Sequence, residues 1–294
     1  MERFFAVPVL PGEPSPKELR SNIFNMIWPV TIDSILQMMV GMVASAMVGR
    51  IGATAIAAVG LSSRVTQISW ALFFGISTGV TVLVARCYGA RDLEEARRIS
   101  FQGLLSAGIL ITIMTILSFW LAEPFLRTMN VGEELLVACM TYLQIALFSL
   151  PLVAMIQISA GIMRGVGNTR IPMMISLIVN IINIVGCWLL IYGNLGLPAM
   201  GIRGAAIAAL VGQGFGAVLA LYVIFSPLSG LQLRNEDVRS LFLPDVKRIL
   251  RIGVPSSAGD LFWQVASIVM TSVIVTFGTV ALAAHNLGMQ AEGI

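Results

Sequence analysis

The chain has 294 residues, of which 57% are hydrophobic and 11% are charged, with 18 Lys and Arg against 15 Asp and Glu. Soluble globular chains carry roughly a quarter of their residues as charged side chains, so this composition excludes an ordinary soluble domain. One histidine and three cysteines without metal-type spacing exclude a multi-histidine metal site and a disulfide framework within these residues.

The first 21 residues are rich in proline and charge, which predicts a solvated tail and not a cleavable signal. Long apolar segments follow, and about 20 such residues in a helix cross a hydrocarbon core of about 30 Å. We therefore predict an all-α integral membrane protein with helices near residues 22–48, 54–85, 99–122, 135–158, 171–193, 203–226 and 250–277, and an eighth from Ala281.

Basic residues alternate between the connections of these helices, and Lys and Arg are known to favour the cytoplasmic side. Only Arg50, Arg127 and Arg203 lie in one set of connections. The other set carries fourteen: Arg3, Lys17, Arg20, Arg86, Arg91, Arg97, Arg98, Arg164, Arg170, Arg234, Arg239, Lys247, Arg248 and Arg251. This asymmetry predicts a multi-pass inner-membrane protein with its N-terminus and the segments 86–98, 164–170 and 234–251 in the cytoplasm, and it explains the basic charge without nucleic acid.

Glycines and a capping pattern mark the expected ends of several predicted helices. Gly89 ends the second segment, and Asp92 followed by Glu95 is a capping pattern that starts the third. Gly165 and Gly167 end the fourth segment. These short connections predict antiparallel neighbouring helices.

Pro29 and Pro255 open two segments that match at an offset of 226 residues (255 minus 29), and each proline is expected to bend its helix. The matching pairs include Gly52 with Gly278 and Ala55 with Ala281. An internal repeat in an apolar chain is typical of a transporter with two related halves. Because 294 minus 226 leaves 68 residues of a second half, we expect residues 1–294 not to transport without the remainder.

Several motifs in order resemble one family. They are WPVTIDSILQMMVGMVASAMVGRIGATAIAAVG from Trp28, VARCYGARDLEEARR from Val84, MRGVGNTRIPM from Met163, NIINIVGCWLLIYG from Asn180, and the repeat that ends in FGTVALAAHN. From about Asn22 onwards the chain resembles the multidrug and toxic compound extrusion (MATE) family of antiporters. The resemblance implies two pseudo-symmetric six-helix bundles around a cavity that opens to one side at a time. It divides the chain into a tail (1–21), a first lobe (22–228), a cytoplasmic linker (229–248) and the start of a truncated second lobe (249–294).

The sequence departs from the family at positions where acids are often found. Ala44 and Cys187 stand where many prokaryotic members carry acids in helices one and five, and Trp263 stands at another such position in helix seven. The roles of those acids therefore cannot be transferred. The family asparagines of helix five are matched by Asn180 and Asn183.

Ionisable residues within the predicted spans are candidates for ion coupling, because a charge there is costly and usually faces the bundle interior. Asp260 heads a polar stripe with Gln264, Ser267 and Thr271, and it is the first candidate for a proton-sensitive group. Asp33 shares a helical face with Gln37. It either couples an ion or forms a structural ion pair with Arg64 on the next helix.

Asn180 and Asn183 also allow two interpretations: hydrogen bonds that hold helices together, or a polar lining of the cavity. We predict a secondary antiporter, not an enzyme, that exports cationic or amphipathic organic compounds in exchange for H⁺ or Na⁺. It needs no cofactor and is expected to be a monomer. One alternative is a lipid flippase in which Arg64 contacts an anionic headgroup. An enzyme of lipid metabolism would need an acid-rich or histidine motif, and DLEEARR is better explained as a capped surface helix.

Overall fold

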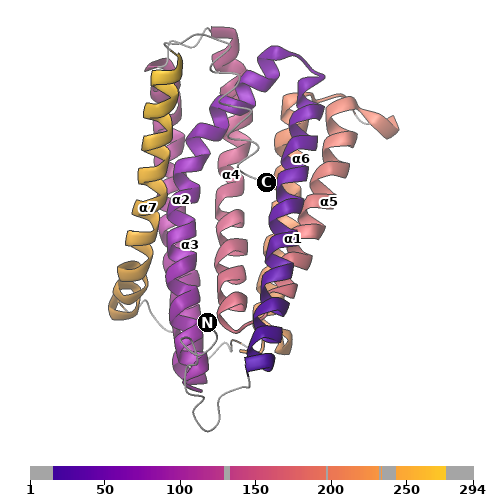
Figure 1. The fold of residues 1–294 in the computed structure, drawn as a ribbon. Coiled ribbons are helices and arrows are strands. Elements are labelled where there is room, and N and C mark those ends of the chain that lie inside the picture. The colour runs from indigo at the N-terminus through magenta and orange to yellow at the C-terminus, as the bar shows by residue number, and fades with distance from the viewer. Residues whose placement is uncertain (1–15, 129–132, 197, 232, 234–242, 276–294) are drawn as a thin grey trace, which may run out of the picture.

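A computed structural model of the chain describes residues 16–128, 133–196, 198–231, 233 and 243–275. Over these residues the backbone forms helices and turns without a strand, which confirms the all-α prediction. The long helices lie side by side in one bundle (Figure 1). Their bounds are α1 Pro16–Gly49, α2 Ala53–Gly89, α3 Leu93–Thr128, α4 Glu133–Gly165, α5 Arg170–Tyr192, α6 Ile202–Phe225 and α7 Leu243–Val275, with short 3-10 turns η2 Asn194–Gly196 and η3 Pro227–Ser229.

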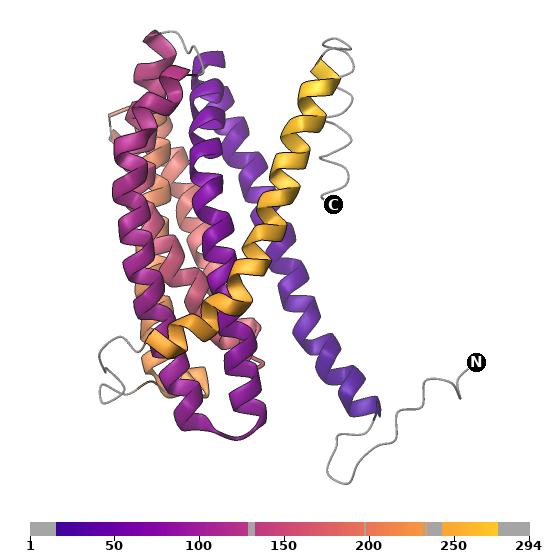
Figure 2. The ribbon, with the colours of Figure 1, turned by 90° about the vertical axis from the view of Figure 1, so that its left-hand side faces the viewer.

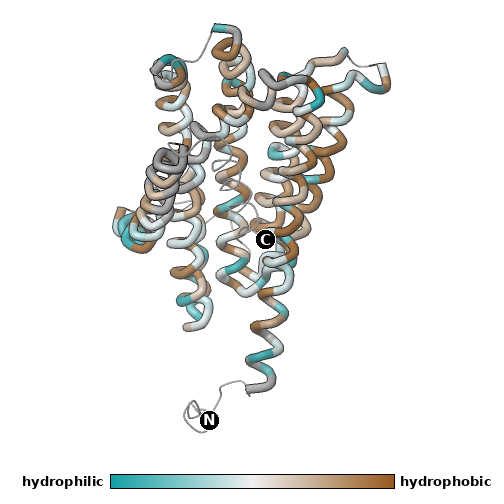
Figure 3. Tube along the Cα trace, turned by 45° about the horizontal axis from the view of Figure 1, so that its top comes forward, coloured by the Kyte–Doolittle hydropathy of each residue, from teal (hydrophilic) through white to brown (hydrophobic). Residues whose placement is uncertain are grey.

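Five helices are long and apolar enough to cross a membrane over the described residues, and α2 adds the shorter apolar stretch Phe73–Gly89. Hydrophobic residues cover most of α5 and α6 (Figure 3). The first six predicted segments coincide with α1 to α6 to within one residue or lie inside them. The eighth predicted helix, from Ala281, lies outside the described residues.

The core of the bundle is centred on α4, which packs against α2, α3 and α6. Half of the most apolar window of α4 is buried, against 6% of that of α1. Fully buried side chains such as Phe73, Leu143 and Ile158 fill the space between these helices. The helix α1 lies at the edge, mainly along α5, so it can act as one wall of a cavity.

The predicted turns have the geometry that their residues favour. The backbone N–H of Glu95 donates to Asp92 Oδ1 at 3.0 Å, which confirms the cap that starts α3. After α4 ends at Gly165, Gly167 adopts a φ of +89°, a left-handed value that favours glycine. The Asn168 side chain then caps α5 by accepting a hydrogen bond from the N–H of Ile171 at 3.3 Å.

The start of α7 packs against the first lobe. The helix begins at Leu243, six residues before the predicted start of the second lobe at 249. It contacts α2 extensively, and glycines allow the close approach: a Cβ atom on Gly79 would collide with the carbonyl oxygen of Ile249, and one on Gly253 would lie 2.6 Å from that of Gly75. Beyond this contact α7 leans away from the bundle (Figure 2).

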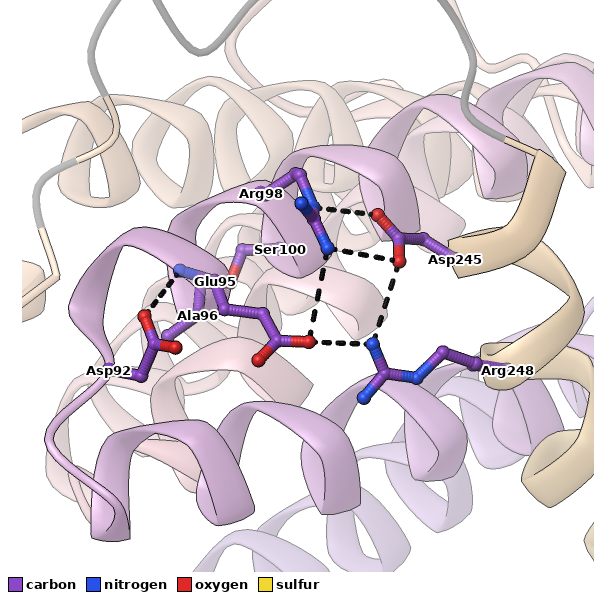
Figure 4. Close-up of polar contacts among 7 residues, drawn as sticks. All are labelled: Asp92, Glu95, Ala96, Arg98, Ser100, Asp245 and Arg248. Atoms are coloured by element: carbon purple, nitrogen blue, oxygen red, sulfur yellow. Dashed lines mark hydrogen bonds and ion pairs between the residues drawn. The ribbon is translucent and has the colours of Figure 1, made fainter.

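Charged side chains join the starts of α3 and α7 (Figure 4). Arg98 Nε lies 2.8 Å from Asp245 Oδ2, and the Asp245 side chain is only 2% exposed. Arg248 Nη1 lies 2.6 Å from Glu95 Oε1 and 3.6 Å from Asp245 Oδ1. Arg98 Nη2 also donates a hydrogen bond to Asp245 Oδ1 at 3.4 Å. We call Glu95, Arg98, Asp245 and Arg248 the α3–α7 charge cluster.

Candidate functional site

A cavity of about 300 Å³ lies inside the bundle, and α1, α2, α4, α5 and α6 all contribute to its lining. Its apolar side includes two aromatic side chains from α2, Trp70 and Phe74. Its polar lining consists of Asp33, Ser34, Gln37, Gln157, Arg164, Ser176, Asn180 and Gln213. Because buried polar groups need partners, this cavity is the candidate functional site.

The α1 wall carries the acid of the cavity. Pro29 is a buried residue in the interior of the α1 sequence, one turn before Asp33. It lacks the N–H that would continue the helical hydrogen bonds. Gln37 Nε2 donates to Asp33 Oδ2 at 3.1 Å. The other oxygen, Asp33 Oδ1, is buried and has no hydrogen-bond partner among the described residues. One oxygen of this carboxylate therefore remains available to a cation or a donor in the cavity.

The two asparagines of α5 lie in different surroundings. Asn180 lines the cavity, and its Nδ2 is buried without an acceptor among the described residues. Asn183, one turn later, accepts a hydrogen bond from Cys187 Sγ at 3.5 Å. It lies beside Gly212 of α6, where an added Cβ would be 3.7 Å from Asn183 Cβ. Asn180 thus has the position of a binding residue, whereas Asn183 has that of a packing residue.

Arg164 is the cavity residue that sequence reasoning missed. The sequence predicts it at a cytoplasmic connection, and that location stays a prediction; the structure places it in the last turn of α4, where it lines the cavity together with Asp33. The Asp33 carboxylate interacts with its guanidinium electrostatically. Gln157 and Arg164 are seven positions apart and therefore share one face of α4, but this spacing alone does not show that the face meets a cavity. Arg164, which counts toward the basic asymmetry of the connections, therefore also lines the cavity inside the bundle.

Three predicted site residues have side chains outside the part of the chain that the structure describes. They are Arg64 on α2 and Asp260 and Gln264 on α7. The proposed Asp33–Arg64 ion pair and the polar stripe of α7 therefore stay predictions. The described residues contain no cluster of three His, Cys, Asp or Glu side chains suited to a metal ion.

A second cavity, of about 620 Å³, lies at the connection between α4 and α5, the end predicted to face the cytoplasm. Asn25, Tyr88 and Gly230 contribute to its lining, together with residues 166–170. Arg170, which follows the α5 cap, is exposed and lines this second cavity, not the first. Arg164 and Arg170, although only six positions apart, therefore line different cavities.

Comparison with known proteins gives consistent matches. The model of the MatE family matches residues 29–189. The probable multidrug resistance protein NorM of Thermotoga maritima is 29% identical over 97% of this chain and 61% of its own length. The probable NorM of Agrobacterium fabrum is 30% identical over 84% of this chain and 53% of its own length.

Among solved structures, one similar protein is a MOP superfamily transporter from Pyrococcus furiosus, described as having a binding pocket of reverse polarity. It is 26% identical, with a TM-score of 0.84 over 92% of this chain and 60% of that chain. The chain thus spans between 53% and 61% of the length of these proteins.

Proposed function

The chain belongs to the MatE family, and on that premise we propose that its protein is a multidrug efflux antiporter. It exports organic compounds, often cationic or amphipathic, in exchange for H⁺ or Na⁺ by alternating access. The multidrug resistance names of the relatives support the class of activity. The helices and the family make the chain a multi-pass integral membrane protein. The bundle described above supplies one wall of the transport pathway.

The observation that carries the proposal is Asp33, an acid on a membrane-spanning helix that faces a polar cavity with one oxygen unsatisfied. A charged group at mid-membrane depth costs ~2.5–3.5 kcal/mol on insertion scales. A proton, Na⁺ or the cationic group of a substrate lowers this cost when it binds Asp33. Competition between the ion and the substrate for one carboxylate then produces exchange, because each favours a different conformational state.

The test uses the complete gene product in proteoliposomes and a fluorescent organic cation whose movement follows an imposed ion gradient. Asp33→Asn removes the charge and is expected to abolish gradient-driven transport while the protein still folds. Asp92→Asn is the matched control, because asparagine caps a helix as well as aspartate does. Undiminished coupled transport by Asp33→Asn would remove Asp33 from the pathway.

A second candidate, translocation of a lipid or lipid-linked compound, is favoured by one observation. Arg164 faces the same cavity, and a guanidinium binds phosphate oxygens in a bidentate manner. The two functions are separated by measuring both organic cation export and movement of a fluorescent phospholipid between leaflets of the same proteoliposomes. Lipid movement without export of the cation would favour the flippase.

A further inference from the structure

Among the residues that the structure describes, the cavity between α1, α2, α4, α5 and α6 has one acid and one base in its lining. These are Asp33 and Arg164, among sixteen described residues that line it. Neither residue belongs to an ion pair among the described residues. Over the described residues the lining therefore has a formal charge of zero; its two charged groups act on each other electrostatically but form no direct ion pair.

Both charged groups retain unused hydrogen-bonding capacity. Asp33 Oδ1 is buried without a donor, and Asn180 Nδ2 is buried without an acceptor among the described residues. Arg164 is half-buried, and no hydrogen bond from its guanidinium to a described residue is observed. An unsatisfied buried polar group is unfavourable, and more so when the group is charged. A ligand that satisfies only Asp33 would leave the guanidinium and the Asn180 amide without partners.

We propose that this cavity selects ligands that carry both a cationic and an anionic group, with Asp33 binding the cationic group and Arg164 and Asn180 binding the anionic group. The aromatic side chains of Trp70 and Phe74 line the same cavity and contact the apolar body of the ligand. The volume of about 300 Å³ is at the small end of the range for drug-sized ligands, ~300–1,000 Å³. The inference rests on the proposed transport function and narrows its substrate class to zwitterions.

The cavity is expected to discriminate between ligands because a singly charged ligand leaves one of its polar groups without a partner. A ligand without the anionic group leaves the guanidinium without a hydrogen-bond acceptor, and a ligand without the cationic group leaves Asp33 Oδ1 without a donor. Sites built to pair a polar group reject analogues that lack it, because the buried partner is then left alone. A zwitterion is therefore preferred over either singly charged relative of the same shape.

Three matched probes test this preference at about pH 6. Phenylalanine is a zwitterion whose ammonium group can donate a hydrogen bond to Asp33 Oδ1, its methyl ester is a cation at this pH, and N-acetylphenylalanine is an anion. Their affinities for the purified complete gene product are measured by equilibrium dialysis. We expect the zwitterion to bind about tenfold more tightly than either relative, which corresponds to one charge-assisted hydrogen bond at ~1.4 kcal/mol per factor of ten.

The variants assign each charge to a residue. Arg164→Gln is expected to lower the affinity for the zwitterion about tenfold and to leave that for the methyl ester unchanged or higher. Asp33→Asn should have the opposite selectivity and preserve binding of the anion. Arg164→Lys keeps the charge but not the planar fork, and it should retain part of the preference. Arg170→Gln makes the same change six positions later, outside the cavity, and should have no effect.

The outcomes distinguish this inference from the proposed function. If no probe binds and no organic cation is transported, the proposed function fails. If transport is observed but Arg164→Gln leaves the ratio of zwitterion to methyl ester unchanged, the inference is wrong. A zwitterionic lipid headgroup presents the same chemistry, so a fluorescent phosphatidylcholine is assayed for movement between leaflets. Competition between phenylalanine and this movement would place the lipid headgroup in the same cavity.

Discussion

Replacing Arg98 should destabilise the protein more than replacing its partner Asp245, because the two ends of this ion pair differ in burial. The Asp245 side chain is 2% exposed and that of Arg98 is 46% exposed. Arg98→Gln leaves a buried carboxylate with Arg248 at 3.6 Å as its remaining ion-pair partner. Asp245→Asn leaves two arginines that water can solvate, and it keeps a side chain of the same shape.

The expected magnitudes follow from this difference. Removing one partner of a fully buried ion pair costs about 3–5 kcal/mol, whereas exposed pairs contribute about 0–1 kcal/mol. Because one end is half exposed, we expect Arg98→Gln to lower the free energy of unfolding by about 2 kcal/mol and Asp245→Asn by about 1 kcal/mol. The double variant should resemble Asp245→Asn, since no buried carboxylate then remains.

The assay is unfolding of purified protein in detergent, followed by size-exclusion fluorescence across a temperature or denaturant series. Hydrogen exchange of the α7 backbone provides a local measure, and it should rise in Arg98→Gln. Arg91→Gln, at an exposed turn residue, controls for the loss of an arginine charge at the same end of the bundle. Equal effects of the two single variants, or effects that simply add in the double variant, would refute the reasoning from burial.

Three further predictions concern packing, topology and coupling. Gly79→Ala should destabilise the protein by about 1–3 kcal/mol, because its Cβ collides with the Ile249 carbonyl oxygen, whereas Gly60→Ala on the same helix has nothing within 4 Å and should be neutral or stabilising in the same unfolding assay. Single cysteines at positions 91 and 239 should resist labelling from outside the cell while one at position 127 is labelled, and the reverse pattern would invert the predicted orientation. Asp260→Asn in the complete gene product should abolish ion-coupled efflux at normal expression, and efflux with unchanged pH dependence would leave Asp33 as the coupling candidate.

Local chemistry allowed much of the fold to be predicted. Apolar length located the helices, and Asp92 and the glycines after α4 located the turns, because caps and left-handed turns depend on residues close in sequence. The Asp33–Gln37 face was also predictable from helical spacing. Arg164 was not, because its charge fits a cytoplasmic end as well as an interior cavity, and only the packing of five helices shows which of these it serves. The early start of α7 was missed because the contacts that hold it come from Gly75, Gly79 and Arg98, which are far away in sequence.

The docking of α7 has a consequence for the order of assembly in the membrane. The surfaces that hold its first turns, on α2 and α3, are complete before α7 is synthesised, because they precede it in the chain. The glycine contact and the α3–α7 charge cluster can therefore orient α7 as soon as it leaves the ribosome. Any helix that follows would be inserted next to an element whose direction is already set. The first bundle would thus serve as a template for the chain that comes after it. A substitution at Gly79 or Arg98 would then cause misassembly of helices that neither residue contacts.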